Sequence, residues 1–283
     1  MHDPVASNSA VDSPAVGMRP CPNCGHASCS IRYAVQAFRI LKCPSCSFVF
    51  SGNLHNEELL YEAYHDTTRE KFDDYSQHSN NAHIAELYAI NEQRVAALSK
   101  WKSTGEMLDI GCGRGYFLST ATRHGFQARG IDVSENAAHY AREQFGLQVT
   151  TRNIQNLINH NTRFDVITLW HVLEHFENPF LQLTKIKSLL SRSGVCIIEV
   201  PNIHSLKFML AKNKWTGGNH PRYHRSFFSS KTLRRALAEA GFSQVKRLQL
   251  SYRIPHRNTA FEVTKSALNI FALDSFLCFA ATR

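Results

Sequence analysis

Short apolar runs alternate with segments whose apolar residues recur at helical spacing, from about residue 105 to the end of the chain. The apolar runs predict strands at residues 106–110, 128–132, 148–151, 164–170, 195–200, 245–250 and 276–281. The helical patterns predict helices at residues 116–124, 135–145, 180–190 and 231–240, and a further short helix at about 261–273. Because strands and helices alternate, the pattern predicts an α/β fold in which a parallel sheet carries helices on both faces.

The residues before this alternation divide into three segments. Residues 1–18 are rich in Ser, Pro, Ala and Asp and are predicted to form a disordered tail. Residues 19–52 contain two cysteine pairs, and residues 53–103 are polar with a helical pattern. A mostly apolar stripe at helical spacing consists of Ile84, Leu87, Tyr88, Asn91, Val95 and Leu98. We therefore expect residues 53–103 to form a helical linker or lid that packs on a domain at residues 104–283.

The two cysteine pairs, Cys21-Pro-Asn-Cys24 and Cys43-Pro-Ser-Cys46, are separated by 18 residues. Two such turns direct four thiolates at one ion, and soft sulfur ligands favour zinc over calcium or magnesium. Four protein ligands close the coordination sphere, so we expect a structural zinc ion in a ribbon at residues 19–52. The alternative is a redox-active cysteine pair.

A glycine-rich segment, Leu108-Asp-Ile-Gly-Cys-Gly-Arg-Gly115, leads from the first strand of the predicted sheet into a helix. Gly111, Gly113 and Gly115 allow a sharp turn and the close approach of a ligand. Their spacing differs from the G-x-G-x-x-G of a dinucleotide site. Ligands of parallel α/β sheets bind at the carboxyl ends of strands, so this turn predicts a ligand site.

Acidic residues end the first two strands of the predicted sheet. Asp109 comes immediately before the turn, where a carboxylate suits a cationic or hydroxylated ligand better than a pyrophosphate. Asp132 lies nineteen residues beyond Gly113 and can accept hydrogen bonds from both hydroxyls of a ribose. The alternative role of Asp132 is a helix N-cap, for which Ser134 is the better candidate.

Three motifs in order, LDIGCGRGYFL, GIDVS and FDVITLWHVLEHF, resemble those of the class I S-adenosylmethionine (SAM)-dependent methyltransferases. The resemblance covers about residues 85–283 and is to the subgroup that contains ubiquinone-type O-methyltransferases and many natural-product enzymes. It implies a Rossmann-like sheet of seven strands whose last strand is antiparallel. It also implies that SAM lies across the ends of the first two strands.

The resemblance assigns a part of SAM to several residues. Asp109 and Gly111 would face the methionine moiety, and Asp132 would take the ribose. Asn153 stands where the family often has Asp near the adenine, which Val133 and Ile154 would flank. The residues predicted to bind the cofactor are Asp109, Gly111, Cys112, Gly113, Gly115, Asp132, Val133, Asn153, Ile154, Trp170 and His171. The last two would border both the cofactor and the substrate pockets.

The segment His171-Val-Leu-Glu-His175 matches the inverted zinc-protease pattern H-x-x-E-H. A protease needs this pattern on a helix, whereas here it directly follows a predicted strand, which argues against that activity. In some ubiquinone-type relatives, a Glu and a Glu-His pair in this segment bind a divalent metal. This chain has His171 in place of the first Glu, so we expect structural roles for Glu174 and His175.

The expected substrate region follows residue 202 and contains three candidate catalytic residues, His220, Tyr223 and His224. A hydroxyl or carbon acceptor must lose a proton, and histidine suits this task because its pKa is near neutral. The family often has a histidine four residues before a Phe-Ser pair, which His224 matches. In sugar C-methyltransferases of similar layout, a Tyr/His pair there serves in catalysis. We expect His224 to be the base, and the alternative is a structural histidine that orients the loop.

The formal net charge is +9, and residues 200–238 contain eight basic residues and no acid. The eight are Lys207, Lys212, Lys214, Arg222, Arg225, Lys231, Arg234 and Arg235. They predict contacts to a phosphate or carboxylate of an anionic acceptor, or a solvated face. No apolar run approaches the roughly 18 residues of a membrane span, and the N-terminus lacks the features of a secretory signal. We therefore expect a cytoplasmic protein without a membrane span.

These features predict an enzyme that methylates oxygen or carbon of a small molecule, such as a nucleotide-linked sugar, a phenol or a natural-product intermediate. The alternative is a zinc-ribbon rRNA or tRNA methyltransferase, because in some rRNA methyltransferases a similar ribbon contacts RNA. No basic–aromatic RNA-binding motif appears in residues 19–52, so nucleic acid is the less favoured partner. A third interpretation, a non-catalytic zinc-ribbon interaction protein, is disfavoured by the intact glycine turn and Asp132.

Overall fold

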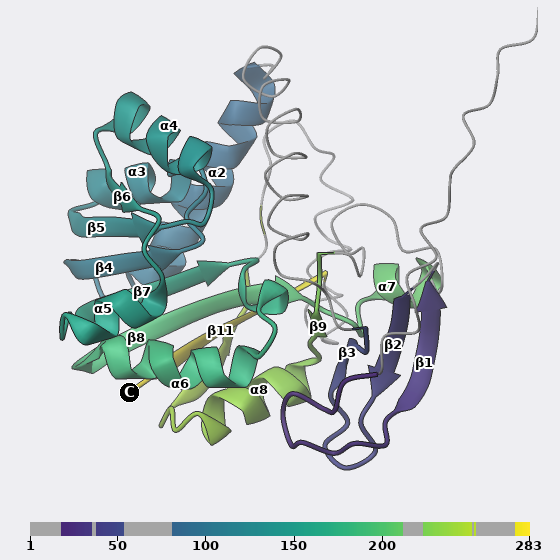
Figure 1. Cartoon of the computed structure of the whole chain (residues 1–283). Coiled ribbons are helices and arrows are strands. Elements are labelled where there is room, and N and C mark those ends of the chain that lie inside the picture. Colours follow the sequence, from purple (N-terminus) through teal and green to yellow (C-terminus); the bar gives the residue numbers. More distant parts are fainter. Residues whose placement is uncertain (1–17, 36–37, 54–80, 212–222, 251, 253–274) are drawn as a thin grey trace, which may run out of the picture.

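The computed structural model describes residues 18–35, 38–53, 81–211, 223–250, 252 and 275–283 (Figure 1). The predicted tail and the predicted helix at about 261–273 therefore lie outside the described residues, as does His220. Within the described ranges, no helix combines the length and the apolar character needed to cross a membrane.

A sheet of seven strands forms the centre of the molecule (Figure 1). Its strands are β4 (Gly105–Ile110), β5 (Phe126–Ile131), β6 (Gln148–Thr150), β7 (Phe164–Trp170), β8 (Leu190–Pro201), β10 (Val245–Leu248) and β11 (Phe276–Thr282). The order is β10-β11-β8-β7-β4-β5-β6, and β11 runs antiparallel to both of its neighbours. The remaining neighbours pair in parallel. The predicted Rossmann-like fold with an antiparallel last strand is therefore confirmed.

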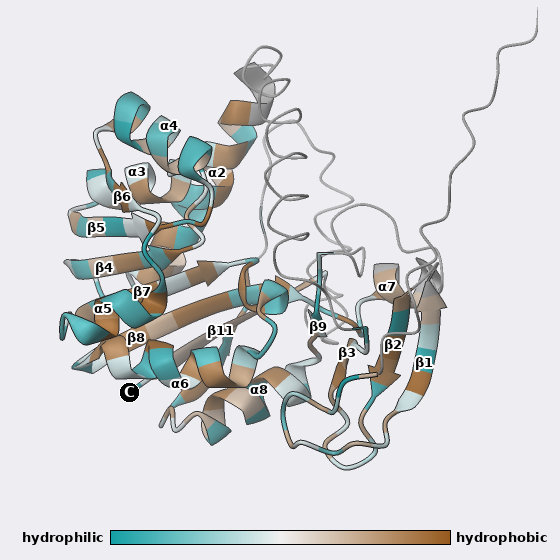
Figure 2. Cartoon of the chain, viewed as in Figure 1, coloured by the Kyte–Doolittle hydropathy of each residue, from teal (hydrophilic) through white to brown (hydrophobic). Residues whose placement is uncertain are grey.

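Helices cover both faces of this sheet because strand side chains alternate between the faces. They are α2 (Asn81–Leu98), α3 (Tyr116–Arg123), α4 (Glu135–Phe145), α5 (Ile154–Asn159), α6 (Pro179–Leu189) and α8 (Ser230–Glu239). Met107 packs in the apolar cluster of α2 and α3, whereas Leu108 packs in that of α6 and α8. Figure 2 shows the resulting brown strands between the helices. Val95 and Leu98 of α2 are fully buried against the seven-stranded sheet, which confirms that this helix packs on the domain built around that sheet, called the larger domain below.

Two parts of this fold differ from the sequence prediction. β8 begins at Leu190 rather than at residue 195, because Leu190 is buried and pairs with Phe164 of β7. The predicted helix at 180–190 therefore ends at Leu189. The sequence analysis did not predict α5 or α7 (Leu206–Ala211), because six residues are too few to show helical periodicity.

A smaller sheet combines the N-terminal ribbon, defined here as residues 19–52, with one strand from the C-terminal half. Its order is β1 (Ser30–Val35), β2 (Phe38–Lys42), β3 (Val49–Ser51) and β9 (Ser226–Phe227). β3 and β9 are antiparallel, and Phe50 pairs with Ser226. The ribbon therefore shares a sheet with the residues that follow His224, a pairing that the sequence did not predict.

Aromatic side chains pack the ribbon against the larger domain. The ring centroid of Phe48 lies 4.9 Å from that of Phe180 and 5.4 Å from that of Phe228. Phe48 and Phe50 are fully buried in the same apolar cluster as α6 and α8. A second apolar cluster, Ile40, Val49, Ile203, Phe208 and Phe227, joins the small sheet to α7. Figure 1 accordingly shows the ribbon strands beside β9 and α7.

Candidate active site

The carboxyl ends of β4, β5 and β7 lie at one edge of the large sheet, where the glycine-rich turn follows β4. Gly111, Gly113 and Gly115 have φ angles of 69°, 52° and 78°, which glycine adopts without strain. An added Cβ at Gly111 would overlap Val172, whereas no neighbouring atom of the described residues lies within 4 Å of the corresponding position at Gly113. The turn therefore leaves open space beside Gly113, where a ligand can approach the backbone.

Asp132 links the end of β5 to this turn. Its Oδ2 accepts a hydrogen bond from the Gly113 amide at 2.8 Å, and its Oδ1 accepts one from the Ser134 amide at 2.9 Å. The Ser134 hydroxyl accepts from the Ala137 amide at 3.3 Å, which confirms Ser134 as the N-cap of α4. A carboxylate oxygen can accept more than one hydrogen bond, so these two contacts do not exclude bonds from a ligand.

Asp109 is buried at the end of β4 and accepts a hydrogen bond from the Thr168 hydroxyl at 2.6 Å. Burial raises the pKa of Asp109 to about 7, although the Thr168 hydrogen bond and the charge of Arg94 oppose the shift. The carboxyl group therefore changes its charge near neutral pH. A cation beside it would favour the ionised form.

The remaining residues predicted at the turn and near the adenine differ in exposure. Val133 has an exposed side chain beside the end of β5, whereas Ile154 is buried in the first turn of α5. Asn153 caps α5, because its side-chain oxygen accepts from the Asn156 amide at 3.0 Å. Cys112 packs its thiol into an apolar cluster of α3, α4 and β6. Its amide donates to the Ile131 carbonyl at 3.2 Å, and its carbonyl accepts from the Gly115 amide at 3.0 Å. Their roles in cofactor binding stay predictions.

A buried network of charges lies at the ends of β7 and β8. Arg94 Nη2 donates to Glu199 Oε1 at 2.7 Å, and the Tyr252 hydroxyl donates to Glu199 Oε2. The guanidinium carbon of Arg94 lies 4.4 Å from the ring centroid of Trp170. Burial raises the pKa of Glu199, but the charge of Arg94 and the hydrogen bond from His171 outweigh it and lower the pKa to about 2. Glu199 is therefore a permanent anion at neutral pH.

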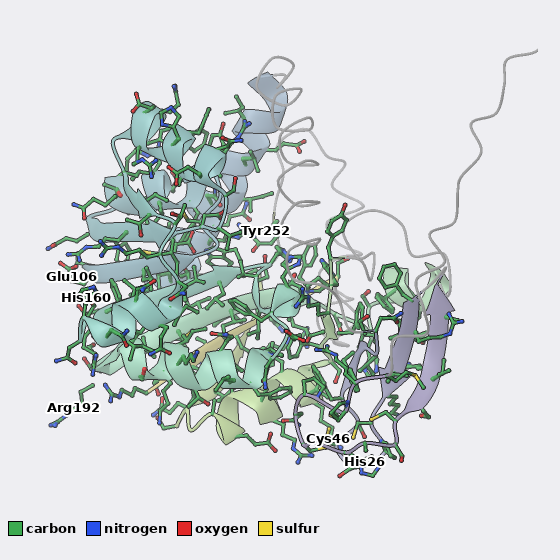
Figure 3. All side chains as sticks on the ribbon, viewed as in Figure 1. His26, Cys46, Glu106, His160, Arg192 and Tyr252 are labelled. Carbon is green, nitrogen blue, oxygen red and sulfur yellow. The ribbon has the colours of Figure 1, made fainter. Side chains whose placement is uncertain are left out.

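Arg94, Glu199 and Tyr252 were not predicted as site residues from the sequence. Glu199 is a lone acid in the apolar run at residues 195–200, and this signal would have found it. Arg94 lies in a polar helix that also contains Glu86 and Glu92, so its charge does not stand out. Tyr252 carries no such pattern. Figure 3 shows Tyr252 at the end of the sheet opposite to Glu106, which lies near the start of β4.

His171 lies between two carboxylates. Its Nε2 is 3.1 Å from Glu199 Oε1, and its Nδ1 is 3.6 Å from Glu174 Oε1. Its φ of 60° is uncommon for a residue with a side chain, and such strain concentrates at functional sites. Burial lowers the pKa of His171, but the two carboxylates outweigh this effect and raise the pKa to about 9. The ring is therefore an imidazolium at neutral pH.

The predicted base His224 lies against the H-x-x-E-H segment, which forms the 3-10 helix η1 (Leu173–His175). The ring centroids of His175 and His224 are 4.8 Å apart. His175 Nδ1 lies 2.9 Å from the Tyr223 carbonyl and donates to it. Both oxygens of Glu174 are buried and accept no hydrogen bond among the described residues. The structure therefore brings Tyr223 and His224 together with the end of β7.

Burial lowers the pKa of His224 to about 3, against the opposing charge of Glu174. The ring is therefore neutral at physiological pH and able to accept a proton. Glu174, His175 and His224 each also offer one ligand atom, and these atoms lie within 4.8 Å of one another. This group could hold a divalent cation, with His224 rather than His171 as its third member.

Four of the five ribbon cysteines, Cys21, Cys24, Cys43 and Cys46, lie close enough together to bind one metal ion. In each C-x-x-C turn, the amide four residues beyond the first cysteine donates to that cysteine's carbonyl: Gly25 to Cys21 at 2.8 Å and Ser47 to Cys43 at 2.9 Å. Cys21 and Cys46 Sγ are 3.5 Å apart, as are Cys24 and Cys43 Sγ. Sulfurs of a tetrahedral zinc site lie about 3.8 Å apart, so the cluster fits zinc.

The basic stretch at residues 200–238 is partly neutralised by its neighbours. Arg225 Nη1 lies 3.7 Å from Glu177 Oε2, and Arg235 Nε lies 2.6 Å from Glu239 Oε1. Arg234 lies over the ring of Phe279 at 5.2 Å and donates to a backbone carbonyl of β10. Arg225 is buried, whereas Lys231, Arg234 and Arg235 are exposed. Lys212, Lys214 and Arg222 lie outside the described residues.

Comparisons with known proteins agree with this geometry. Residues 81–247 match a family described as a methyltransferase domain, which is more than half of the chain. The chain therefore belongs to this methyltransferase family, as its resemblance to the class I SAM-dependent enzymes predicts.

Curated relatives include two ubiquinone biosynthesis O-methyltransferases. The protein from Glaesserella parasuis is 30% identical over 138 residues, which are 44% of this chain and 58% of the relative. That from Psychrobacter cryohalolentis is 33% identical over 114 residues, which are 38% of this chain and 44% of the relative. The chain thus spans about half the length of these relatives.

A solved structure with a similar fold is the 1,6-didemethyltoxoflavin-N1-methyltransferase of Burkholderia thailandensis. It contains bound 1,6-didemethyltoxoflavin and S-adenosylhomocysteine. Its TM-score is 0.55 at 15% identity, and the match covers 90% of this chain and 99% of that one. At this identity the similarity establishes the fold alone.

The glycine-rich turn gives a prediction about stability. We expect Gly113→Ala to lose about 1–2 kcal/mol of unfolding free energy, which is the cost of a left-handed backbone with a Cβ. Gly111→Ala should lose about 1–3 kcal/mol more, because its Cβ overlaps Val172. Urea denaturation of both variants measures the difference, and equal losses would contradict the packing described for the turn.

The cysteine cluster gives a prediction about metal content. Purified protein should contain about one zinc ion per chain, and Cys43→Ser should lose it because three thiolates bind the ion more weakly. Cys29→Ser is the matched control, since Cys29 lies in the ribbon but outside the group of four. Elemental analysis of the three proteins tests this assignment. Zinc loss in the Cys29 variant, or no zinc in the wild type, would refute it.

Proposed function

We propose that this protein transfers the methyl group of SAM to an oxygen or carbon atom of a small molecule. The acceptor is a nucleotide-linked sugar, a phenol or a natural-product intermediate. One observation carries the proposal: the open glycine turn and Asp132 lie together at the ends of adjacent strands β4 and β5. The family membership and the S-adenosylhomocysteine bound by the Burkholderia enzyme support SAM as the cofactor.

The residues at this edge suit the parts of SAM. Asp109 can ionise beside a cationic group, and Asp132 keeps lone pairs for the ribose hydroxyls. The exposed side chain of Val133 offers an apolar surface to the adenine. The indole Nε1 of Trp170 is buried and has no hydrogen-bond partner among the described residues, so it can donate to a bound ligand. Each of these groups complements a different part of the cofactor.

SAM supplies the methyl group and the leaving group, so the protein has to position the acceptor and remove its proton. We assign the removal of the acceptor's proton to the His224 ring, which is neutral at physiological pH. The lowered pKa makes this ring a weak base, because burial outweighs the charge of Glu174, which favours the imidazolium. Tyr223 contributes through its carbonyl, which orients His175. His220 stays a third candidate.

The ribbon and the remaining segments complete this proposal. Zinc at Cys21, Cys24, Cys43 and Cys46 has a structural role, because four protein ligands leave no position for substrate. Of the predicted linker or lid at residues 53–103, residues 54–80 lie outside the described residues, and α2 precedes the methyltransferase domain that we place at 104–283. We place the protein in the cytoplasm, where thiols stay reduced.

An RNA acceptor is the less favoured alternative. It requires an accessible basic surface that contacts phosphates. Arg225 of the basic stretch is buried and lies 3.7 Å from a carboxylate oxygen of Glu177. One face of the small ribbon sheet also packs against α7. Both observations support a small acceptor over RNA.

The first experiment is calorimetric titration with S-adenosylhomocysteine. Asp132→Ala should bind at least about tenfold more weakly, because it loses the proposed ribose contacts. Wild-type affinity should fall as the pH is lowered from about 8 to about 6, because a carboxyl group with a pKa of about 7 loses its charge there. Asp109→Asn should bind weakly without this pH dependence. Normal binding by Asp132→Ala would refute the ribose assignment.

The second experiment tests His224 at saturating SAM, with a catechol or a nucleotide-linked sugar as acceptor. We expect His224→Gln to lower kcat by about 100-fold or more, while S-adenosylhomocysteine binding is unchanged. A base acts in its deprotonated form, so the lowered pKa predicts that kcat stays constant between about pH 7 and about pH 5. Unchanged turnover would exclude His224 as the base. Turnover that needs an added divalent cation would instead assign His224 to a metal site with Glu174.

A further inference from the structure

Arg19 is a buried arginine of the ribbon that joins three segments of the chain. It lies two residues before Cys21, and 8% of its surface is exposed. Its Nε donates to the Ser51 carbonyl at 2.8 Å, its Nη1 to the Glu177 carbonyl at 3.0 Å and its Nη2 to the Arg225 carbonyl at 3.4 Å. A desolvated guanidinium needs such partners, so Arg19 fixes these carbonyls relative to one another.

Both the backbone amide and the backbone carbonyl of Arg225 form hydrogen bonds to other segments. Its amide donates to the Glu174 carbonyl at 2.9 Å, and its carbonyl accepts from the Ser51 amide at 2.9 Å. β9 follows directly and pairs with β3 of the ribbon. Arg225, which follows His224, is therefore held between the ribbon and Glu174, and the carboxylate of Glu174 faces His224.

Ion pairs contribute less to this arrangement than the backbone bonds do. The carboxylate of Glu177 lies 3.9 Å from Arg19 Nη1 and 3.7 Å from Arg225 Nη1. The side chain of Glu177 is 44% exposed, and exposed ion pairs are weak. The buried bonds from Arg19 and Ser51 to carbonyl and amide groups are protected from water. They are the contacts that hold residues 224–227 in place.

We propose that the ribbon is a working part of the active site, in which Arg19 and β3 fix the position of His224 relative to Glu174. The inference rests on the proposed function for the role of His224 as the base. Arg19 touches neither cofactor nor acceptor in this account and is a positioning residue. The ribbon, which lies outside the methyltransferase sheet, thus stabilises the segment of the site that contains His224.

The test compares Arg19→Met, Arg19→Lys and the control Arg32→Met in the zinc-loaded, full-length chain. Methionine keeps much of the side-chain length of Arg19 but has no donor, and lysine keeps the charge with a single ammonium group. Arg32 lies on β1 of the same ribbon and stacks on Tyr33, so its removal controls for the loss of one ribbon arginine.

Hydrogen–deuterium exchange followed by mass spectrometry measures the effect without any acceptor. In Arg19→Met, we expect amides of residues 174–178 and 224–228 to exchange about tenfold faster or more, because their local opening becomes easier. Arg19→Lys should lie between this variant and the wild type, and Arg32→Met should match the wild type. Amides of β4 and β5, zinc content and S-adenosylhomocysteine affinity should not change in any of them. Acceleration throughout the chain would show a general loss of stability and would overturn the proposal.

Turnover gives the second measurement. Arg19→Met should lower kcat by about tenfold or more with little change in the KM for SAM, since the base moves while the cofactor edge stays intact. Arg19→Lys should recover part of the loss. Unchanged exchange at residues 224–228, or normal kcat despite faster exchange there, would overturn the positioning role. A wild-type protein that binds no S-adenosylhomocysteine would refute the proposed function instead, and the exchange result would still decide whether Arg19 holds the segment.

Discussion

The packing of the ribbon against the larger domain is the contact on which the proposed active site depends. Phe48 is buried between Phe180 and Phe228, and β3 forms the sheet partner of β9. A strand of two residues has no stability alone, and a ribbon of about thirty residues cannot form a sufficient core. β9 and the ribbon therefore stabilise each other, and the segment that contains His224 is held by the ribbon as well as by the larger domain.

Residues 170–175 connect the two sides of the site. Trp170 ends β7 beside the edge of the large sheet that we propose as the cofactor edge, and His171 continues into the buried network with Glu199. Glu174 then places its carboxylate against His224 and its carbonyl against the amide of Arg225. The charges compensate one another: His171 and Arg94 are cations, and the two glutamates are anions, so their burial is tolerated. One short segment thus links the cofactor edge to the ribbon.

Local patterns in the sequence predicted the large sheet, most of its helices, the glycine turn and the cysteine cluster, because period, turn chemistry and ligand spacing are all local. Contacts between distant segments were not predictable in this way. The pairing of β3 with β9 joins Phe50 to Ser226, and neither residue carries a signal for the other. Arg19 is one of four basic residues in the ribbon sequence, and nothing near it in the sequence indicates its three carbonyl partners. The start of β8 at Leu190 likewise depends on packing against Phe164.

The packing of the ribbon implies that the ribbon and the methyltransferase domain unfold together. Differential scanning calorimetry of the zinc-loaded chain, with and without a chelator, measures whether they do. We expect a single unfolding transition whose midpoint falls when zinc is removed, because the ribbon stabilises the domain that it packs on. Two separate transitions, with that of the larger domain unaffected by the chelator, would contradict it.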